Sequence, residues 1–124
     1  MKTLVKNIPI YTRKLVFIIC NDFIAEGKKL NIIFDPEDIE SCRGLAFEAN
    51  YKGKEAYYIF VKEDTYIPWS VIAHEALHVT NMVMKKAHVK PDHDNDEAHC
   101  YLLGWIIDEI HIHLSKDTIE KDNK

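Results

Sequence analysis

The stretch PWSVIAHEALHVTNMVMKK, residues 68–86, repeats apolar residues with the period of an α-helix. The apolar side chains that share one face are Val71, Ile72, Ala76, Val79 and Val83. Proline suits the first position of a helix, so Pro68 marks its beginning, and the pattern ends near Lys86. An apolar face of this width predicts a helix that is largely buried.

Two histidines occupy this helix in the pattern His74-Glu75-Ala76-Leu77-His78. Residues four apart lie one turn apart on the same helix face, so both imidazoles can reach one ion. Zinc is held by histidine nitrogens at about 2.0–2.1 Å. Glu75 projects beside such an ion, where it can act as a general base without being a ligand. The pattern predicts Zn2+ bound by His74 and His78, with Glu75 as the catalytic carboxylate.

A catalytic zinc takes three protein ligands and keeps one position for water. The candidates for the third ligand are His88, His93, Asp94, Asp96, Glu97 and His99. Glu97 stands early in the next predicted helix, which can return antiparallel to the first. It also fits a capping box with Asp94, or a favourable charge at the helix N-terminus. We predict Glu97 as the third ligand, with Asp94 and His93 as the next choices.

The rest of the chain predicts a small sheet and two further helices. The expected strands are 8–11, 15–20 and the hairpin 44–50 and 54–62, while 32–34 fits either a strand or a packed loop. The expected helices are 23–30, capped by Asp22, and 95–114. Residues 115–124 are expected to form a polar frayed tail. We therefore predict one α+β domain over residues 1–124, with a three- or four-stranded, mainly antiparallel sheet packed on the histidine-bearing helix and a C-terminal helix.

Composition narrows the classes of partner. The 124 residues carry a net charge of −4, which argues against nucleic acid and anionic membranes as partners. No signal-peptide pattern and no apolar run of about 20 residues is found, so a cytoplasmic protein is expected. The three cysteines, Cys20, Cys42 and Cys100, show no CxxC spacing. They are expected to be buried or half-buried apolar residues, and not a disulfide framework or a thiolate zinc site.

The pattern His74-Glu75-x-x-His78, followed by a helix that carries Glu97, resembles the gluzincin branch of the zincin metallopeptidases. The run Glu97-Ala98-x-x-Tyr101-x-Leu103 is similar to that of the small intracellular ImmA/IrrE proteases. Residues 8–11, the HExxH helix and residues 95–105 together resemble small proteins encoded by tailed phages.

These resemblances imply a zincin-like fold and a zinc-dependent metallopeptidase, with His74, His78 and Glu97 as ligands and Glu75 as general base. The implied substrate is a peptide or protein, of the phage or its host, in the host cytoplasm or associated with the virion. In zincins an edge strand beside the metal helix pairs with extended substrate, and residues 57–61 are the candidate for that strand.

Two features depart from the larger gluzincins. Tyr101 stands where they often carry an aspartate that supports the first histidine, and no residue clearly matches their oxyanion-stabilising side chain. His93, His99 and Tyr101 are the candidates for that second role. The alternative function is therefore a phage structural or host-interaction protein in which zinc staples the fold without turnover.

Overall fold

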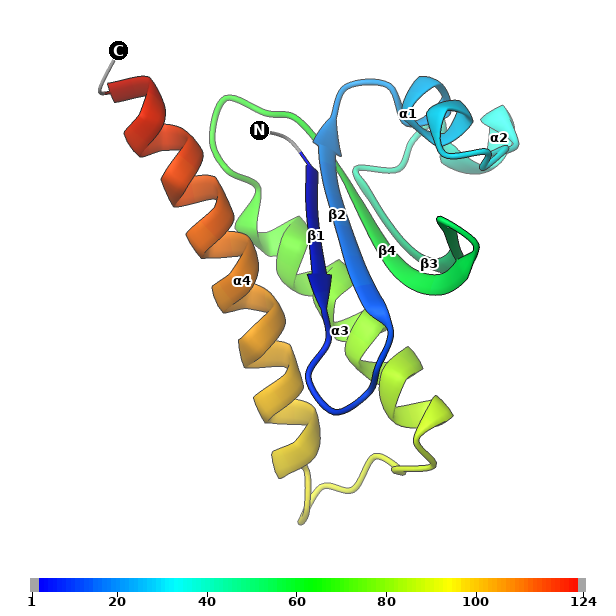
Figure 1. Ribbon diagram of the computed structural model, residues 1–124, viewed down its shortest axis with the longest axis vertical. Helices are drawn as coiled ribbons and strands as arrows, with labels where there is room; N and C mark the ends of the chain where they lie inside the picture. Colours follow the sequence, from blue (N-terminus) through cyan, green and yellow to red (C-terminus); the bar gives the residue numbers. More distant parts are fainter. Residues whose placement is uncertain (1–2, 123–124) are drawn as a thin grey trace.

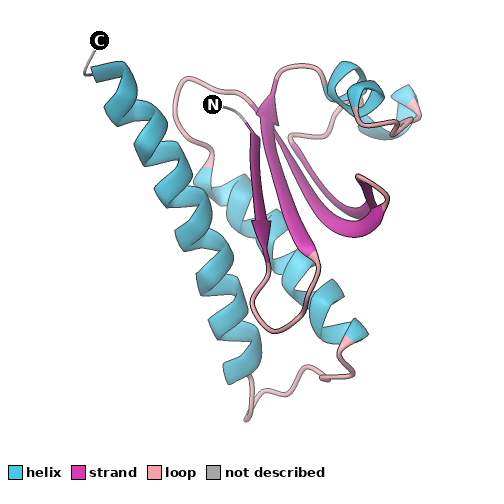
Figure 2. Ribbon diagram, viewed as in Figure 1, coloured by secondary structure: helices cyan, strands magenta, loops and turns pink. Residues whose placement is uncertain are grey.

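Four strands and four helices alternate irregularly along the chain (Figures 1 and 2). The computed structural model describes residues 3–122, with side chains to residue 116. The elements are β1 (Thr3–Asn7), β2 (Lys14–Cys20), α1 (Phe23–Lys29), α2 (Pro36–Ile39), β3 (Gly44–Tyr51), β4 (Lys54–Lys62), α3 (Trp69–Lys86) and α4 (Glu97–Asp122).

The strands form one mixed sheet in the order β1-β2-β4-β3. β1 pairs antiparallel with β2, and β3 antiparallel with β4, whereas β2 and β4 are parallel. A parallel pairing needs a long connection between its strands, which α1, α2 and β3 supply here. The α+β class, a sheet of three or four strands and the strands predicted at 15–20, 44–50 and 54–62 are confirmed, whereas the strand predicted at 8–11 is not.

Both faces of the sheet are covered, which explains the continuous apolar runs of its central strands. On one face, Phe17 and Ile59 join a core completed by α3 and α4 (Figure 1). On the other face, Tyr58 and Phe60 pack with Phe23 of α1. Residues 57–61 are thus the buried centre of the sheet, and their suggested role as a substrate-binding edge is wrong. The edge strand that contacts α3 is β3.

The three helices predicted from the sequence are present, and the residues at which they begin and end differ from the prediction. Asp22 caps α1, because its Oδ1 accepts the Ala25 backbone N–H at 3.1 Å. In α3, Pro68 occupies the cap position and the helix begins at Trp69. The backbone of α4 stays helical through Asp122, so the expected frayed tail is helical over residues 115–122. Residues 123 and 124 lie outside the described part.

The N-terminal strand lies earlier than expected. Residues 3–7 form β1, whereas residues 9–11 form a turn. Positive φ angles at Ile10 (71°) and Thr12 (64°) are incompatible with a strand. Pro9 therefore belongs to the turn and not to an edge strand.

The three cysteines differ in exposure. Cys20 is buried and Cys42 half-buried, as expected, but Cys100 is exposed on α4. Burial raises the pKa of the Cys20 thiol to about 11, which keeps it protonated near neutral pH. All three are free thiols.

None of the described helices combines the length and the apolar character that crossing a bilayer requires.

The packing of α4 on α3 can be tested with two isoleucines of α4. Ile106 is fully buried in the core, whereas Ile112 is 46% exposed. Ile106→Ala should lower the free energy of unfolding by about 2–5 kcal/mol, because it leaves a cavity. Ile112→Ala, the matched control, should change it by less than about 0.5 kcal/mol. Urea unfolding followed by circular dichroism measures both, and equal effects would contradict this docking.

Candidate metal centre

The outer side of α3 carries the two histidines of the motif. His74 and His78 are exposed, whereas the neighbouring Ile72, Ala76 and Val79 are fully buried against the sheet. The Nε2 atoms of the two imidazoles lie 3.2 Å apart, and the ring planes cross at 71°. The sequence thus brings the two nitrogens to one point on the surface of the helix.

This separation suits a shared ion. Two nitrogens bound at about 2.0–2.1 Å with a tetrahedral angle lie about 3.3 Å apart. Without an ion, the same approach needs one Nε2–H to donate to the other Nε2. Candidate ligand atoms of His74, Glu75 and His78 all lie within 4.8 Å of one another. The donor set therefore fits a zinc ion.

Glu75 differs from the histidines because its side chain is covered. It is 6% exposed, and its Oε2 is buried without a hydrogen-bond partner among the described residues. A buried carboxylate oxygen without a partner is costly, and such atoms concentrate where a site awaits a ligand or water. Glu75 thus has an oxygen free to accept a proton or a hydrogen bond.

Gly44, the first residue of β3, is what lets α3 approach the sheet edge at this point. A Cβ at Gly44 would lie 2.6 Å from Cγ1 of Val71 and 2.9 Å from Cγ of Glu75. A side chain there would require those of Val71 and Glu75 to shift. Glycine at a strand end often marks such a close approach, and this was the one sequence signal for the contact.

The contact between β3 and α3 leaves a hollow of about 370 Å3 beside the motif. Its lining residues are Arg43, Gly44, Ser70, Val71, His74 and Glu75. Arg43 and Ser70 were not among the site residues predicted from the sequence. Arg43 is distant in the chain from the motif, and only the packing of β3 on α3 brings it there.

Glu97 is outside the group formed by His74, Glu75 and His78. It is the exposed first residue of α4, and it shares its side of that helix with Tyr101 and Asp108, which are also exposed. The Asp94 N–H donates to Asp92 Oδ1 at 2.9 Å, so the described structure contains no capping box with Glu97. The structure does not bring Glu97 together with the two histidines, and its ligation of zinc stays a prediction.

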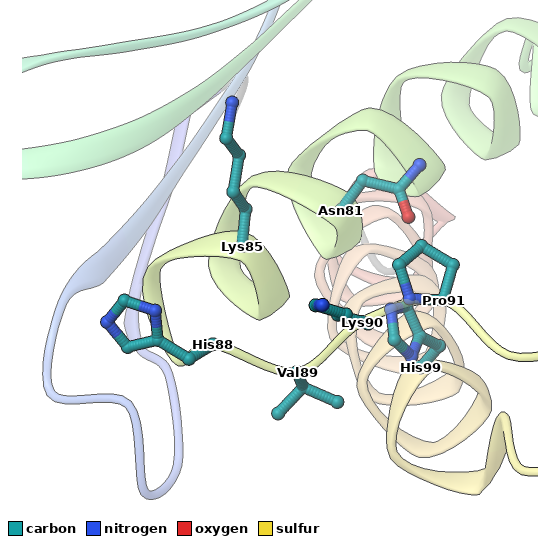
Figure 3. A pocket seen from close by; sticks show the side chains of 7 residues that line it. All are labelled: Asn81, Lys85, His88, Val89, Lys90, Pro91 and His99. Atoms are coloured by element: carbon teal, nitrogen blue, oxygen red, sulfur yellow. The ribbon is translucent and has the colours of Figure 1, made fainter.

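Two other candidates line a separate cavity of about 470 Å3 at the C-terminal end of α3 (Figure 3). Figure 3 shows His88 on the connection after α3 and His99 on α4, on different sides of this cavity. Both ring nitrogens of His99 are buried without a partner among the described residues. Neither histidine is among the residues that line the hollow beside His74.

The remaining candidates for stabilising an oxyanion lie elsewhere. Tyr101 is 75% exposed and lines an apolar hollow with Ile10 and Trp105. His93 is exposed in the turn before α4. None of the three candidates lines the hollow beside His74, and their role in stabilising an oxyanion stays a prediction.

Compared with protein-family models, with curated proteins and with solved structures, the chain shows no match. The case for a function therefore depends on the site itself.

The close approach at Gly44 can be tested by adding one methyl group. Gly44→Ala should destabilise the fold by about 1–3 kcal/mol, because Val71 and the Cγ of Glu75 must shift. Gly104→Ala is the control: its Cβ meets nothing within 4 Å, and alanine in a helix is favoured by about 1 kcal/mol. Thermal unfolding compares the two. A Gly44→Ala protein as stable as wild type would show that α3 and β3 are not in contact here.

Proposed function

We propose that this protein is a zinc-dependent metallopeptidase with a zincin-like fold, in which Glu75 is the general base. The observation that carries the proposal is the convergence of His74 Nε2 and His78 Nε2, 3.2 Å apart, beside the buried side chain of Glu75, whose Oε2 has no partner among the described residues. When bound, zinc supplies Lewis acidity toward the scissile carbonyl and lowers the pKa of water toward 7.

Glu75 is suited to take the proton from the attacking water. Its side chain lies beside Gly44 of β3 and lines the hollow that it shares with His74, and its Oε2 has no hydrogen-bond partner among the described residues. A positioned carboxylate of this kind can accept a proton and return it to the leaving amine. Burial fixes its direction, so little reorganisation is needed during the reaction.

The alternative, zinc as a staple of the fold, has weaker support. A staple must connect separate elements, whereas His74 and His78 belong to one turn of α3. Structural zinc sites are closed by four protein ligands. Here both histidines are exposed, and the one further member of the described group is Glu75. An open, accessible site favours chemistry on a substrate.

An extended peptide is the proposed substrate, and β3 is its proposed docking edge. Among the described strands, β3 lies at the edge of the sheet and pairs with β4, and its first residue lies against Glu75. The free backbone groups of such an edge can pair with a peptide in the manner of an added strand. A peptide bound there passes directly over the hollow beside His74.

Zinc binding is the first prediction of this proposal. The purified protein should contain close to one zinc per chain. His74→Ala or His78→Ala should weaken zinc affinity by more than about 100-fold, which exceeds the usual effect of removing a residue that only hydrogen-bonds to a metal ligand. Glu97→Ala should weaken it at least tenfold if Glu97 is the third ligand. Asp108→Ala, on the same exposed side of α4, should not.

Competition with a chromophoric chelator measures these affinities. Unchanged affinity in both histidine variants would exclude the metal centre. Full affinity in Glu97→Ala would exclude the gluzincin ligand set and direct the same test to Asp94 and His93.

The role of Glu75 is tested separately from zinc binding. Glu75→Gln should keep zinc and fold but reduce cleavage of a peptide library by about 10²–10⁴-fold, the usual contribution of a general base. Mass spectrometry of the digested library reads the result. Wild-type and Glu75→Gln proteins that both bind zinc and are equally inert would instead support the structural role.

A further inference from the structure

Arg43 brings a permanent positive charge into the hollow that His74 and Glu75 line. It is one of two arginines in the chain, and the other, Arg13, pairs with Glu48 in the middle of β3. A guanidinium offers five N–H donors in a planar fork that matches a carboxylate. Apart from Glu75, no residue that lines the hollow is acidic.

The guanidinium is available for a ligand. Its one ion pair in the described structure joins Nη2 to Asp64 Oδ2 at 3.0 Å, with side-chain exposures of 63% and 51%. Exposed pairs of this kind contribute only about 0–1 kcal/mol, so they are exchanged easily for a second carboxylate. Asp64 also holds Arg43 near the hollow without consuming its remaining donors.

The direction of β3 determines which part of a bound peptide reaches Arg43. Gly44 contacts Val71 and Glu75, whereas Glu48, further along β3, borders a cavity with Met82 and Lys86. β3 therefore runs in the same direction as α3. A peptide added antiparallel to β3 has its C-terminal end toward Gly44 and Arg43.

The strand edge also ends at this point. β3 begins at Gly44, and Arg43 directly precedes it. Each residue of an extended peptide advances about 3.3 Å, so the first or second residue after the level of Glu75 reaches the guanidinium. In the described part of the chain, β3 does not continue past Gly44 to hold a longer C-terminal segment.

We propose that Arg43 binds a carboxylate carried by the first or second residue that follows the scissile bond, and so selects the substrate. As a substrate subsite it depends on the proposed peptidase function. The carboxylate comes either from the C-terminus of the peptide or from an acidic side chain. In the first case the protein removes one or two residues from a C-terminus.

The test measures peptide binding by calorimetry to the zinc-loaded Glu75→Gln protein, which should bind without cleaving. Three probes are compared: acetyl-tetraalanine with a free C-terminus, its C-terminal amide, and acetyl-Ala-Ala-Ala-Glu amide. One of the two probes that carry a carboxylate should bind at least about tenfold more tightly than the neutral amide. The probe that does so shows whether Arg43 recognises the peptide C-terminus or an acidic side chain. Adding Arg43→Gln should remove that preference. Adding Arg13→Gln, whose arginine pairs with Glu48 and Glu55, should leave it intact.

Equal affinity for all three probes overturns the inference. So does a preference that survives Arg43→Gln, because the carboxylate then binds the metal itself. The same titrations without metal separate this inference from the proposed function: an Arg43-dependent preference in a protein that takes up no zinc preserves the subsite and removes the peptidase. If the wild-type protein with zinc cleaves the acid and the amide peptides equally well, the proposed peptidase function is kept and the Arg43 subsite is excluded.

Discussion

The approach of α3 to the edge strand at Gly44 is the contact on which the site depends. Because Gly44 has no side chain, Val71 and Glu75 can lie directly against the beginning of β3. This contact buries the side chain of Glu75, whereas His74 and His78 of the same helix are exposed. One helix thus brings a buried carboxylate and two exposed imidazoles within reach of one ion.

The two-layer arrangement of the core explains why this helix is held firmly. α3 packs on the sheet through Ile72, Ala76 and Val79, and α4 packs alongside it in the same core through Leu102 and Ile106. Interiors packed in this way tolerate little displacement. The histidine nitrogens are therefore positioned by the backbone of a buried helix, which gives a more precise site than a loop would.

Much of the fold was accessible from the sequence because the patterns were local. The helical period of residues 69–86, the cap at Asp22 and the hairpin around Gly53 each depend on neighbours in the chain. The order of the strands was not accessible in this way. Nothing local distinguishes β4 as a central strand from β4 as an edge, because its apolar run fits either position.

The same distinction applies to the site. His74, Glu75 and His78 could be predicted because a single helix fixes their spacing. Arg43 could not, because its place beside them depends on a strand that reaches α3 through the tertiary fold. Glu97 is the intermediate case: its helix was predicted, but a helical period does not say which side of α4 faces the histidines.

The parallel pairing of β2 with β4 has a consequence for the order of folding. The β3–β4 hairpin closes over a short turn and can form within microseconds, whereas β2 must wait until the whole segment between residues 20 and 54 has been ordered. Such non-local pairing slows folding, because loop entropy is lost before the contacts compensate for it. The hairpin that carries Gly44 therefore comes early, and the central pairing that completes the floor beneath α3 comes late.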